Sequence, residues 1–182
     1  MPDETGQAKV NRIFVEKRKG YDTRARILYR DLKENLSVKG LEAVRVAARY
    51  DILGITPEIY ARSRGLIFSD PTVDLVYDEF LPLREKDRVF ALEYLPGQFD
   101  QRANSAAQCL QILTGSGRPE VACARVIVLT GKISHDDFAR IKKYCLNPIE
   151  SREASLHKPQ KSAAKTQTPP DVEVLSGFNS KT

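Results

Sequence analysis

The 182-residue sequence lacks most of the motifs that enzymes and cofactor-binding proteins display. It has neither a GxxxxGK[S/T] loop nor a GxGxxG fingerprint, the two familiar glycine-rich cradles for phosphate groups. Its two histidines and three cysteines show neither CxxC nor other zinc-type spacing, and no cysteine–histidine catalytic pair is indicated. We therefore expect no catalytic, cofactor-binding or metal-binding residue in this chain. Cys109, Cys123 and Cys145 are interpreted as reduced core thiols of a cytosolic protein.

Long apolar runs and a strong charge of one sign are also absent. No run approaches membrane-spanning length, and residues 1–9 are polar and lack the apolar core of a secretory signal. The net charge is +5, of which residues 151–182 contribute 5 − 3 = +2. The remaining +3 is spread over nearly all the charged side chains, which argues against a strongly basic nucleic-acid module. We expect a cytoplasmic protein without a membrane or nucleic-acid partner.

What the sequence does contain is an internal repeat. Residues 55–62 recur in similar form as 133–140, which gives the offset 133 − 55 = 78. Arg-Ile-Phe at 12–14 matches Arg-Val-Phe at 88–90, with the offset 88 − 12 = 76. Two sets with the spacing of one helical face recur at the first of these offsets, since 99 − 21 = 78. We expect both sets to be buried: Tyr21, Ala25, Leu28 and Leu32; Phe99, Ala103, Ala106 and Leu110.

Each copy is predicted to fold as strand, helix, strand, helix. The first copy has these elements over residues 10–16, 21–36, 44–52 and a short stretch capped by Thr56; the second has them over 88–94, 99–113, 121–129 and 134–146. An extra strand is predicted over 73–78. The inward face of 121–129 stays open, because a slip of one residue would exchange its two faces. The fold class is α+β, a tandem duplication with a largely antiparallel sheet and helices on one face.

The expected domain organisation has three parts. Residues 1–9 form a polar arm, and residues 10–147 form the duplicated domain, with copies at about 10–66 and 88–146. Residues 148–182 are rich in Ser, Lys, Thr, Gln and Pro, so we expect a linker that is flexible in isolation and cleaved between residues 155 and 170. The apolar residues within 172–178 are interpreted as a docking segment.

Two polar runs are candidates for function. Gly-Ser-Gly-Arg at 115–118 could contact a phosphate, but it follows a predicted helix, so a helix-ending turn is the favoured interpretation. The run at 95–102 contains a Pro-Gly turn and an aspartate at a predicted helix start. Its remaining polar side chains, together with one just beyond it, are candidates for a partner-facing surface: Gln98, Gln101, Arg102 and Asn104.

Three segments resemble the N-terminal region of the large, single-chain phosphoribosylformylglycinamidine synthase. They are residues 12–17 (RIFVEK), 94–103 (YLPGQFDQRA) and 147–153 (NPIESRE). The Gly-Tyr-Asp junction at 20–22 is similar to that of PurS, the small separate subunit of the multi-subunit form of this enzyme. The resemblance covers essentially the whole chain.

The resemblance implies a role in de novo purine synthesis, where this ligase converts formylglycinamide ribonucleotide to the amidine with ATP, magnesium and glutamine-derived ammonia. The family's N-terminal domain is a fused pair of PurS-like units that helps to position the synthetase and glutaminase domains. Those domains would be the partners, in cis or in trans, and would carry ATP, magnesium and all catalysis. This chain alone would be an inactive fragment ending in the linker. Glu150 and Arg152 join Gln98, Gln101, Arg102 and Asn104 as expected domain-interface residues.

The alternative is an independent protein- or RNA-binding α+β module. Related layouts present exposed aromatic side chains of a sheet to RNA bases. Phe14 and Phe90, however, lie in short apolar strands with no basic-aromatic consensus around them. Salt-dependent retention of RNA would separate this alternative from the assembly role.

Overall fold

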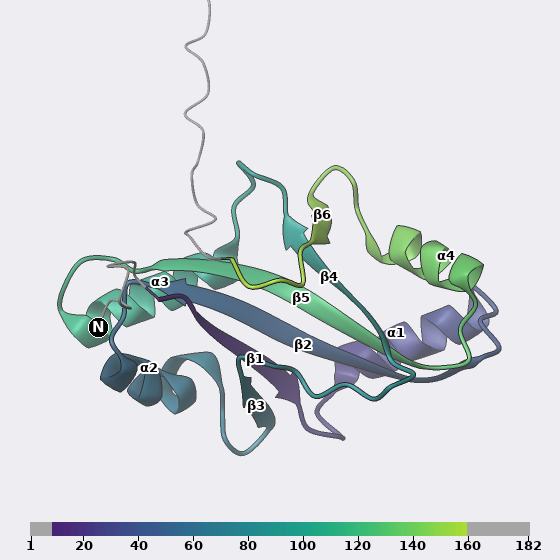
Figure 1. Ribbon diagram of the computed structural model, residues 1–182, viewed down its shortest axis with the longest axis horizontal. Coiled ribbons are helices and arrows are strands. Elements are labelled where there is room, and N and C mark those ends of the chain that lie inside the picture. Colours follow the sequence, from purple (N-terminus) through teal and green to yellow (C-terminus); the bar gives the residue numbers. More distant parts are fainter. Residues whose placement is uncertain (1–8, 160–182) are drawn as a thin grey trace, which may run out of the picture.

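Six antiparallel strands form one sheet in the computed structural model, which describes residues 9–159 (Figure 1). The strand order is β3-β1-β2-β5-β4-β6. The strands are β1 (Asn11–Lys17), β2 (Leu41–Leu53), β3 (Asp74–Asp78), β4 (Arg88–Tyr94), β5 (Glu120–Gly131) and β6 (Ser151–Ala154). The helices are α1 (Thr23–Glu34), α2 (Pro57–Ser63), α3 (Gln101–Thr114) and α4 (His135–Cys145), with a π-helical turn, η1 (Arg64–Phe68), after α2. The predicted α+β class is confirmed.

All four helices cover the same face of the sheet and leave two separate cores beneath them. Leu32 of α1 and Ile141 of α4 pack with Phe90 and Leu129 over one end. Leu110 of α3 packs with strand residues and with η1 over the other end, the members including Ile13, Tyr50, Ile52 and Phe68. The helix-covered face is therefore filled at both ends.

The long central strands β2 and β5 join the two halves of the molecule. They pair from Leu41 opposite Gly131 to Leu53 opposite Glu120, with one register shift between Leu41 and Ala43, so the sheet continues across the middle. β2 contains the strand that the sequence predicted over 44–52 and is longer by a few residues at its start. A single half would bury little apolar surface by itself, so the pairing of β2 with β5 is needed for a sizeable core.

The two halves have the same element order and the same pairing register. Arg12 lies opposite Asp51 in the β1–β2 pair, and Val89 lies opposite Val128 in the β4–β5 pair. Both equivalences correspond to one offset, since 89 − 12 = 77 and 128 − 51 = 77. The shared register supports the repeat hypothesis.

The faces on which the side chains lie correct the alignment of the first strand. The sequence match gave an offset of 76 for this strand, one less than the structural offset of 77. Because side chains alternate along a strand, the offset of 76 would match helix-facing residues of β1 with residues on the opposite face of β4. Ile13 and Phe90, which are related by the structural offset, both face the helices. The structure also shows which face of β5 is directed toward the helices, a question that the sequence left open. Ile127 and Leu129 pack with helices, whereas Val126 and Val128 face the other side.

The prediction of two buried helical faces is correct inside the helices and wrong just before them. Leu32 and Leu110 are fully buried, and Leu28 is partly buried. The alanines of the two faces are also buried: Ala25, Ala103 and Ala106. Tyr21 and Phe99 are instead 60% and 69% exposed. Because α1 begins at Thr23 and α3 at Gln101, helical periodicity does not extend back to these two aromatic residues.

Local start and stop signals form as expected. Thr56 caps α2 by accepting a hydrogen bond from the Ile59 N–H at 3.4 Å, and Ser134 caps α4 by accepting one from the Asp137 N–H at 3.0 Å. Gly115 ends α3 in the left-handed conformation, with φ 62°. The run 115–118 is therefore a helix-ending turn, the favoured of its two interpretations.

The predicted linker boundary at 148 is wrong. Ser151–Ala154 forms β6, an edge strand paired with β4, and residues 155–159 continue across the sheet in front of β5 (Figure 1). The polar sequence of β6 shows no strand pattern; its order comes from the hydrogen-bonding edge that β4 offers. The docking segment at 172–178 and the rest of the linker from 160 on lie outside the described residues, as does nearly all of the N-terminal arm.

Two chain segments cover the helix-free face of the sheet. The Arg45 guanidinium donates to the Pro82 carbonyl at 2.8 Å, fixing segment 79–87. Arg49 donates to the Ser155 carbonyl at 2.6 Å and Arg12 to the Leu156 carbonyl at 2.8 Å, fixing segment 155–159. The part of the helix-free face that these segments cross is therefore covered by the chain itself.

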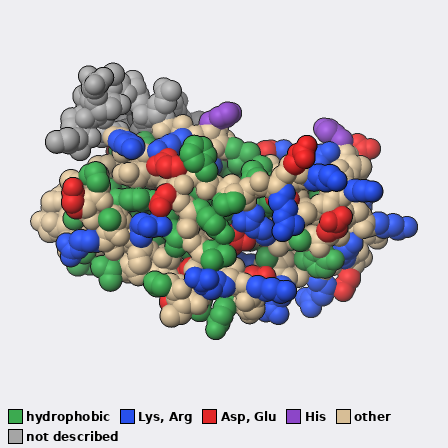
Figure 2. Space-filling model, turned by 60° about the horizontal axis from the view of Figure 1, so that its bottom comes forward, with side chains coloured by type: hydrophobic (Ala, Val, Ile, Leu, Met, Phe, Trp, Pro, Cys, Tyr) green, Lys and Arg blue, Asp and Glu red, His purple; other side chains and the backbone are tan. Residues whose placement is uncertain are grey.

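The molecular surface carries both signs of charge. Lysine and arginine side chains are interspersed with aspartate and glutamate over the face in Figure 2. None of the helices within residues 9–159 is long and apolar enough to cross a membrane.

Candidate functional site

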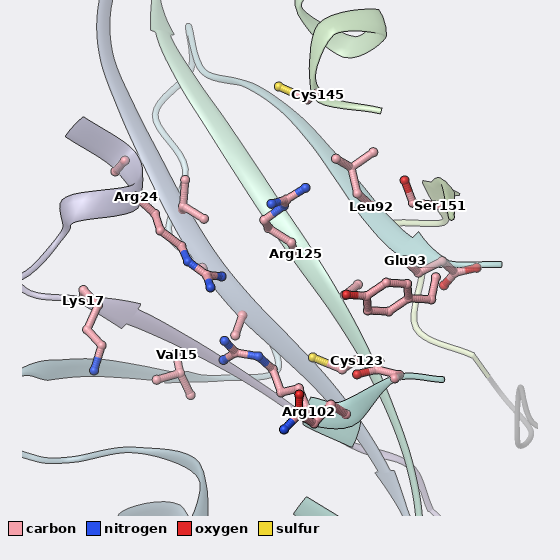
Figure 3. Close-up of a pocket in the computed structure, with 18 of the residues that line it drawn as sticks. Val15, Lys17, Arg24, Leu92, Glu93, Arg102, Cys123, Arg125, Cys145 and Ser151 are labelled. Atoms are coloured by element: carbon pink, nitrogen blue, oxygen red, sulfur yellow. The ribbon is translucent and has the colours of Figure 1, made fainter. Parts of the chain in front are cut away.

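A groove of about 950 Å³ separates the two helix-covered cores. Its floor is formed by the middle of the sheet, and its walls by the start of α1, the start of α3 and the turn before β6 (Figure 3). The two helices begin at this groove, and their buried leucines belong to cores at opposite ends of the sheet. The tandem arrangement of the halves thus creates the groove at their junction, and we call it the central groove.

The floor of the central groove is largely apolar. Val15, Val46, Ala48, Leu92 and Cys123 line it from β1, β2, β4 and β5. Ala48 pairs directly with Arg125 of the neighbouring strand. Because alanine has a short side chain, it leaves space above the strand pair in which the arginine is exposed to solvent.

Three guanidinium groups extend into the central groove from three different elements (Figure 3). Arg24 comes from the first turn of α1, Arg102 from the first turn of α3, and Arg125 from the middle of β5. Within residues 9–159, the side chains of Arg24 and Arg125 make neither a hydrogen bond nor an ion pair. Arg102 donates to the Tyr50 hydroxyl at 3.3 Å. Two guanidinium groups that have no charged partner among residues 9–159 therefore lie in the groove.

Most of the carboxylates around the groove are already engaged. Asp74 pairs with Lys17 at 2.8 Å, and Glu93 pairs with Arg152 at 2.7 Å. Asp22 accepts from the Gly20 N–H and Asp100 from the Ala103 N–H, both at 3.0 Å. The remaining acidic lining residue, Glu150, is exposed in the turn before β6. Five carboxylates therefore line the groove beside four basic side chains. Among these charged lining residues, Arg24, Arg125 and Glu150 make no side-chain hydrogen bond or ion pair within residues 9–159.

The two helix starts that meet at the groove differ in their capping. The Asp100 side chain caps α3, whereas the Asp22 side chain makes no capping hydrogen bond to α1. No acidic residue lies in the first turn of α1 either. Its first N–H groups therefore keep their capacity to bind an anion, to which the helix dipole adds a favourable field.

Cys123 and Cys145 are not activated nucleophiles. Burial raises the pKa of the Cys123 thiol to about 12 and that of the Cys145 thiol to about 11. Both stay protonated near neutral pH, and a thiol, unlike a thiolate, is a poor nucleophile and metal ligand. Cys109 lies on the outer side of α3 and is exposed, so its assignment to the core was wrong.

The structure brings three of the six expected interface residues to the groove and separates the others. Gln101, Arg102 and Glu150 line it. Arg152 lies on β6, where it is paired with Glu93. The Asn104 carboxamide binds Arg118.

The sixth residue, Gln98, is exposed in the turn before α3. The sequence interpretation overlooked Arg24 and Arg125 as site residues. A signal for Arg24 did exist, since Arg24 and Arg102 occupy matching places in the repeat, with the offset 102 − 24 = 78 that the helical faces share. Nothing local marks Arg125, whose position depends on the pairing of two distant strands.

The central groove offers guanidinium groups, a free helix start and an apolar floor, and these define its chemistry. Among residues 9–159, no group of three or more His, Cys, Asp or Glu side chains could hold a metal ion. No family model matches the chain, and no curated protein or solved structure is detectably similar to it. The function is therefore inferred from the geometry and from the sequence resemblance.

Proposed function

We propose that this chain is the N-terminal structural and assembly domain of a phosphoribosylformylglycinamidine synthase. The observation that carries the proposal is the shared register of two strand–helix–strand–helix units in one continuous sheet. A fused pair of PurS-like units, which the resemblance of residues 12–17, 94–103 and 147–153 implies, would have this arrangement.

In this proposal the chain acts in the cytoplasm as part of an ATP- and glutamine-dependent carbon–nitrogen ligase. The synthetase domains would bind ATP and magnesium, and the glutaminase domain would supply ammonia. The present chain would contribute rigid surface and no catalytic group. Its contribution to the rate would be to hold the two catalytic units in a productive relative position.

The surface best suited to this contact surrounds the turn at 95–100. Tyr94, Phe99 and Ile149 expose large apolar side chains there, at 51%, 69% and 77%. Gln98 and Gln101 add exposed amides. Aromatic side chains surrounded by polar groups are typical of the centre of protein–protein interfaces.

Complementation in trans tests the proposal. A synthase lacking its N-terminal domain is assayed for amidine formation from formylglycinamide ribonucleotide, ATP and glutamine, with and without the complete chain. We expect the chain to raise glutamine-dependent turnover and to have no turnover alone. Full activity of the truncated enzyme without the chain would refute the assembly role, and turnover by the chain alone would refute its lack of catalysis.

Matched variants on one helix locate the contact. Gln101→Ala with Phe99→Ala should weaken the restoration of activity, because both side chains belong to the proposed surface. Gln108→Ala with Gln111→Ala changes exposed residues farther along α3 and should leave the restoration intact. Equal effects of the two pairs would place the contact elsewhere.

The RNA-binding alternative has less support. Phe14 is 7% exposed on the helix-free face, and Phe90 is 1% exposed beneath the helices, so neither ring is accessible for base stacking. Retention of single-stranded RNA that weakens steeply with salt would favour the alternative.

A further inference from the structure

We propose that the central groove binds an organic phosphate monoester. The phosphate would lie between Arg24 and Arg125 at the start of α1, with Arg102 beside it, and the organic part would lie on the apolar floor. This site adjoins the proposed assembly surface, since Tyr94 and Gln101 belong to both, but the binding of its ligand does not depend on the assembly role.

The arginines of the groove support a phosphate. Guanidinium groups bind phosphate oxygens through paired, charge-assisted hydrogen bonds. Arg24 and Arg125 make no side-chain hydrogen bond or ion pair within residues 9–159, so a ligand would not have to displace a protein partner. Arg102 is held by the Tyr50 hydroxyl, which fixes its direction.

The start of α1 adds backbone donors on the same side. Asp22 makes no capping hydrogen bond to this helix, in contrast to Asp100 of α3. A helix start with free N–H groups binds phosphate well, and here it contributes the arginine Arg24 as well. The carboxylate of Asp22 is directed to the Gly20 N–H, at 3.0 Å, instead of into the first turn.

The size and lining of the groove favour an organic ester over phosphate alone. Its volume of about 950 Å³ is much larger than one phosphate group requires. Val46, Leu92 and Cys123 form an apolar floor, and Tyr21 and Tyr94, exposed by 60% and 51%, stand at the rim. A planar base or a sugar fits such a surface, since aromatic rings stack on bases.

Titration of the complete chain with adenosine monophosphate, adenosine and inorganic phosphate tests this site. Arginine side-chain and backbone signals are followed by NMR at low ionic strength, because salt screens exposed charges. We expect the nucleotide to bind most tightly, phosphate more weakly, and adenosine not detectably at the same concentrations. The shifted signals should include Thr23, Arg24 and Arg125.

Two double variants with the same change in net charge separate a site from general attraction. Arg24→Gln with Arg125→Gln should weaken nucleotide binding by about tenfold or more, the effect of losing charge-assisted hydrogen bonds. Arg30→Gln with Arg62→Gln, exposed residues of α1 and α2 outside the groove, should leave affinity within about twofold.

Each other result overturns the proposal. An equal loss in both double variants would mean non-specific attraction, and binding of adenosine as tight as the nucleotide would mean an apolar site only. Absence of shifts with all three probes, or shifts confined to other surfaces, would leave the groove without this ligand. A failed complementation assay would change none of these readouts, because Arg24 and Arg125 lie outside the proposed assembly surface.

Discussion

The two halves of the molecule pair their strands identically but bury opposite chemistry on the helix-free side. In the first half, Arg12 and Asp51 form an ion pair at 2.8 Å that is joined by Arg49. All three are nearly inaccessible, with exposures of 3%, 7% and 5%. The equivalent positions of the second half hold three valines: Val89, Val126 and Val128.

The same strand register therefore accommodates either a buried ion-pair group or three valines. Valines gain stability by burial alone, whereas a buried ion pair gains little net stability over apolar residues of similar volume. The arginine side chains of the charged group, unlike valine, can also donate hydrogen bonds to another segment of the chain. Arg12 and Arg49 reach the carbonyls of Leu156 and Ser155, and so fix the chain after β6 to the opposite half of the sheet.

The largest effect is expected at Asp51. Asp51→Ala leaves two buried guanidinium groups without their shared counter-charge, and it should lower the free energy of unfolding by about 3–5 kcal/mol. Urea denaturation followed by circular dichroism measures this loss. A loss below about 1 kcal/mol would show that water reaches the two arginines.

A second variant replaces the three buried charged residues of the first half by the valines of the second half. The triple variant Arg12→Val, Arg49→Val, Asp51→Val should recover most of the stability lost in Asp51→Ala, because no buried charge is left over. It should also release segment 155–159, measured as faster hydrogen exchange after Ala154. A triple variant as unstable as the single one would contradict the equivalence of the two halves.

The next largest effect is expected in the two helix cores. Leu32 and Leu110 occupy matching places on α1 and α3 and are both fully buried. Leu32→Ala and Leu110→Ala should each cost about 2–5 kcal/mol in unfolding free energy, the range for cavities in well-packed cores. Ile112→Ala, 82% exposed on α3, is the control and should be nearly neutral. A neutral effect at one leucine alone would break the symmetry of the cores.

The helix caps should distinguish the halves by a smaller amount. Asp100→Ala removes a capping bond to the Ala103 N–H and should cost about 1 kcal/mol, while Asp22→Ala removes no cap of α1 and should cost less. Asp100→Asn keeps an acceptor oxygen and serves as the conservative control. Thermal unfolding of the four proteins gives the comparison, and equal losses at both aspartates would mean that Asp22 also caps in solution.

The smallest effect is expected at the two aromatic residues that precede the helices. Tyr21→Ala and Phe99→Ala should each change the unfolding free energy by about 0.5 kcal/mol or less, because both rings are mostly exposed. Denaturant midpoints of the two variants and the unmodified chain provide the measurement. A loss of several kcal/mol at Phe99 would mean that its ring packs against the domain.

Local chemistry accounts for most of what could be predicted here. Helix starts at Thr56 and Ser134 and the stop at Gly115 depend on hydrogen bonds and backbone angles within a few residues. The apolar spacing of α1 and α3 and the alternation of β2 are likewise visible in short stretches. The α+β class with helices on one face follows from these patterns, since each apolar stripe must be covered.

Only the tertiary structure decided the features that depend on distant partners. The helix-facing side of β5 follows from its pairing with β2, and a shift of one residue would have placed the opposite side toward the helices. β6 is a strand because β4 has a free edge, although its four residues carry no strand pattern. The central groove exists because two helix starts meet there, so the grouping of Arg24, Arg102 and Arg125 is a property of packing that no single stretch of the sequence encodes.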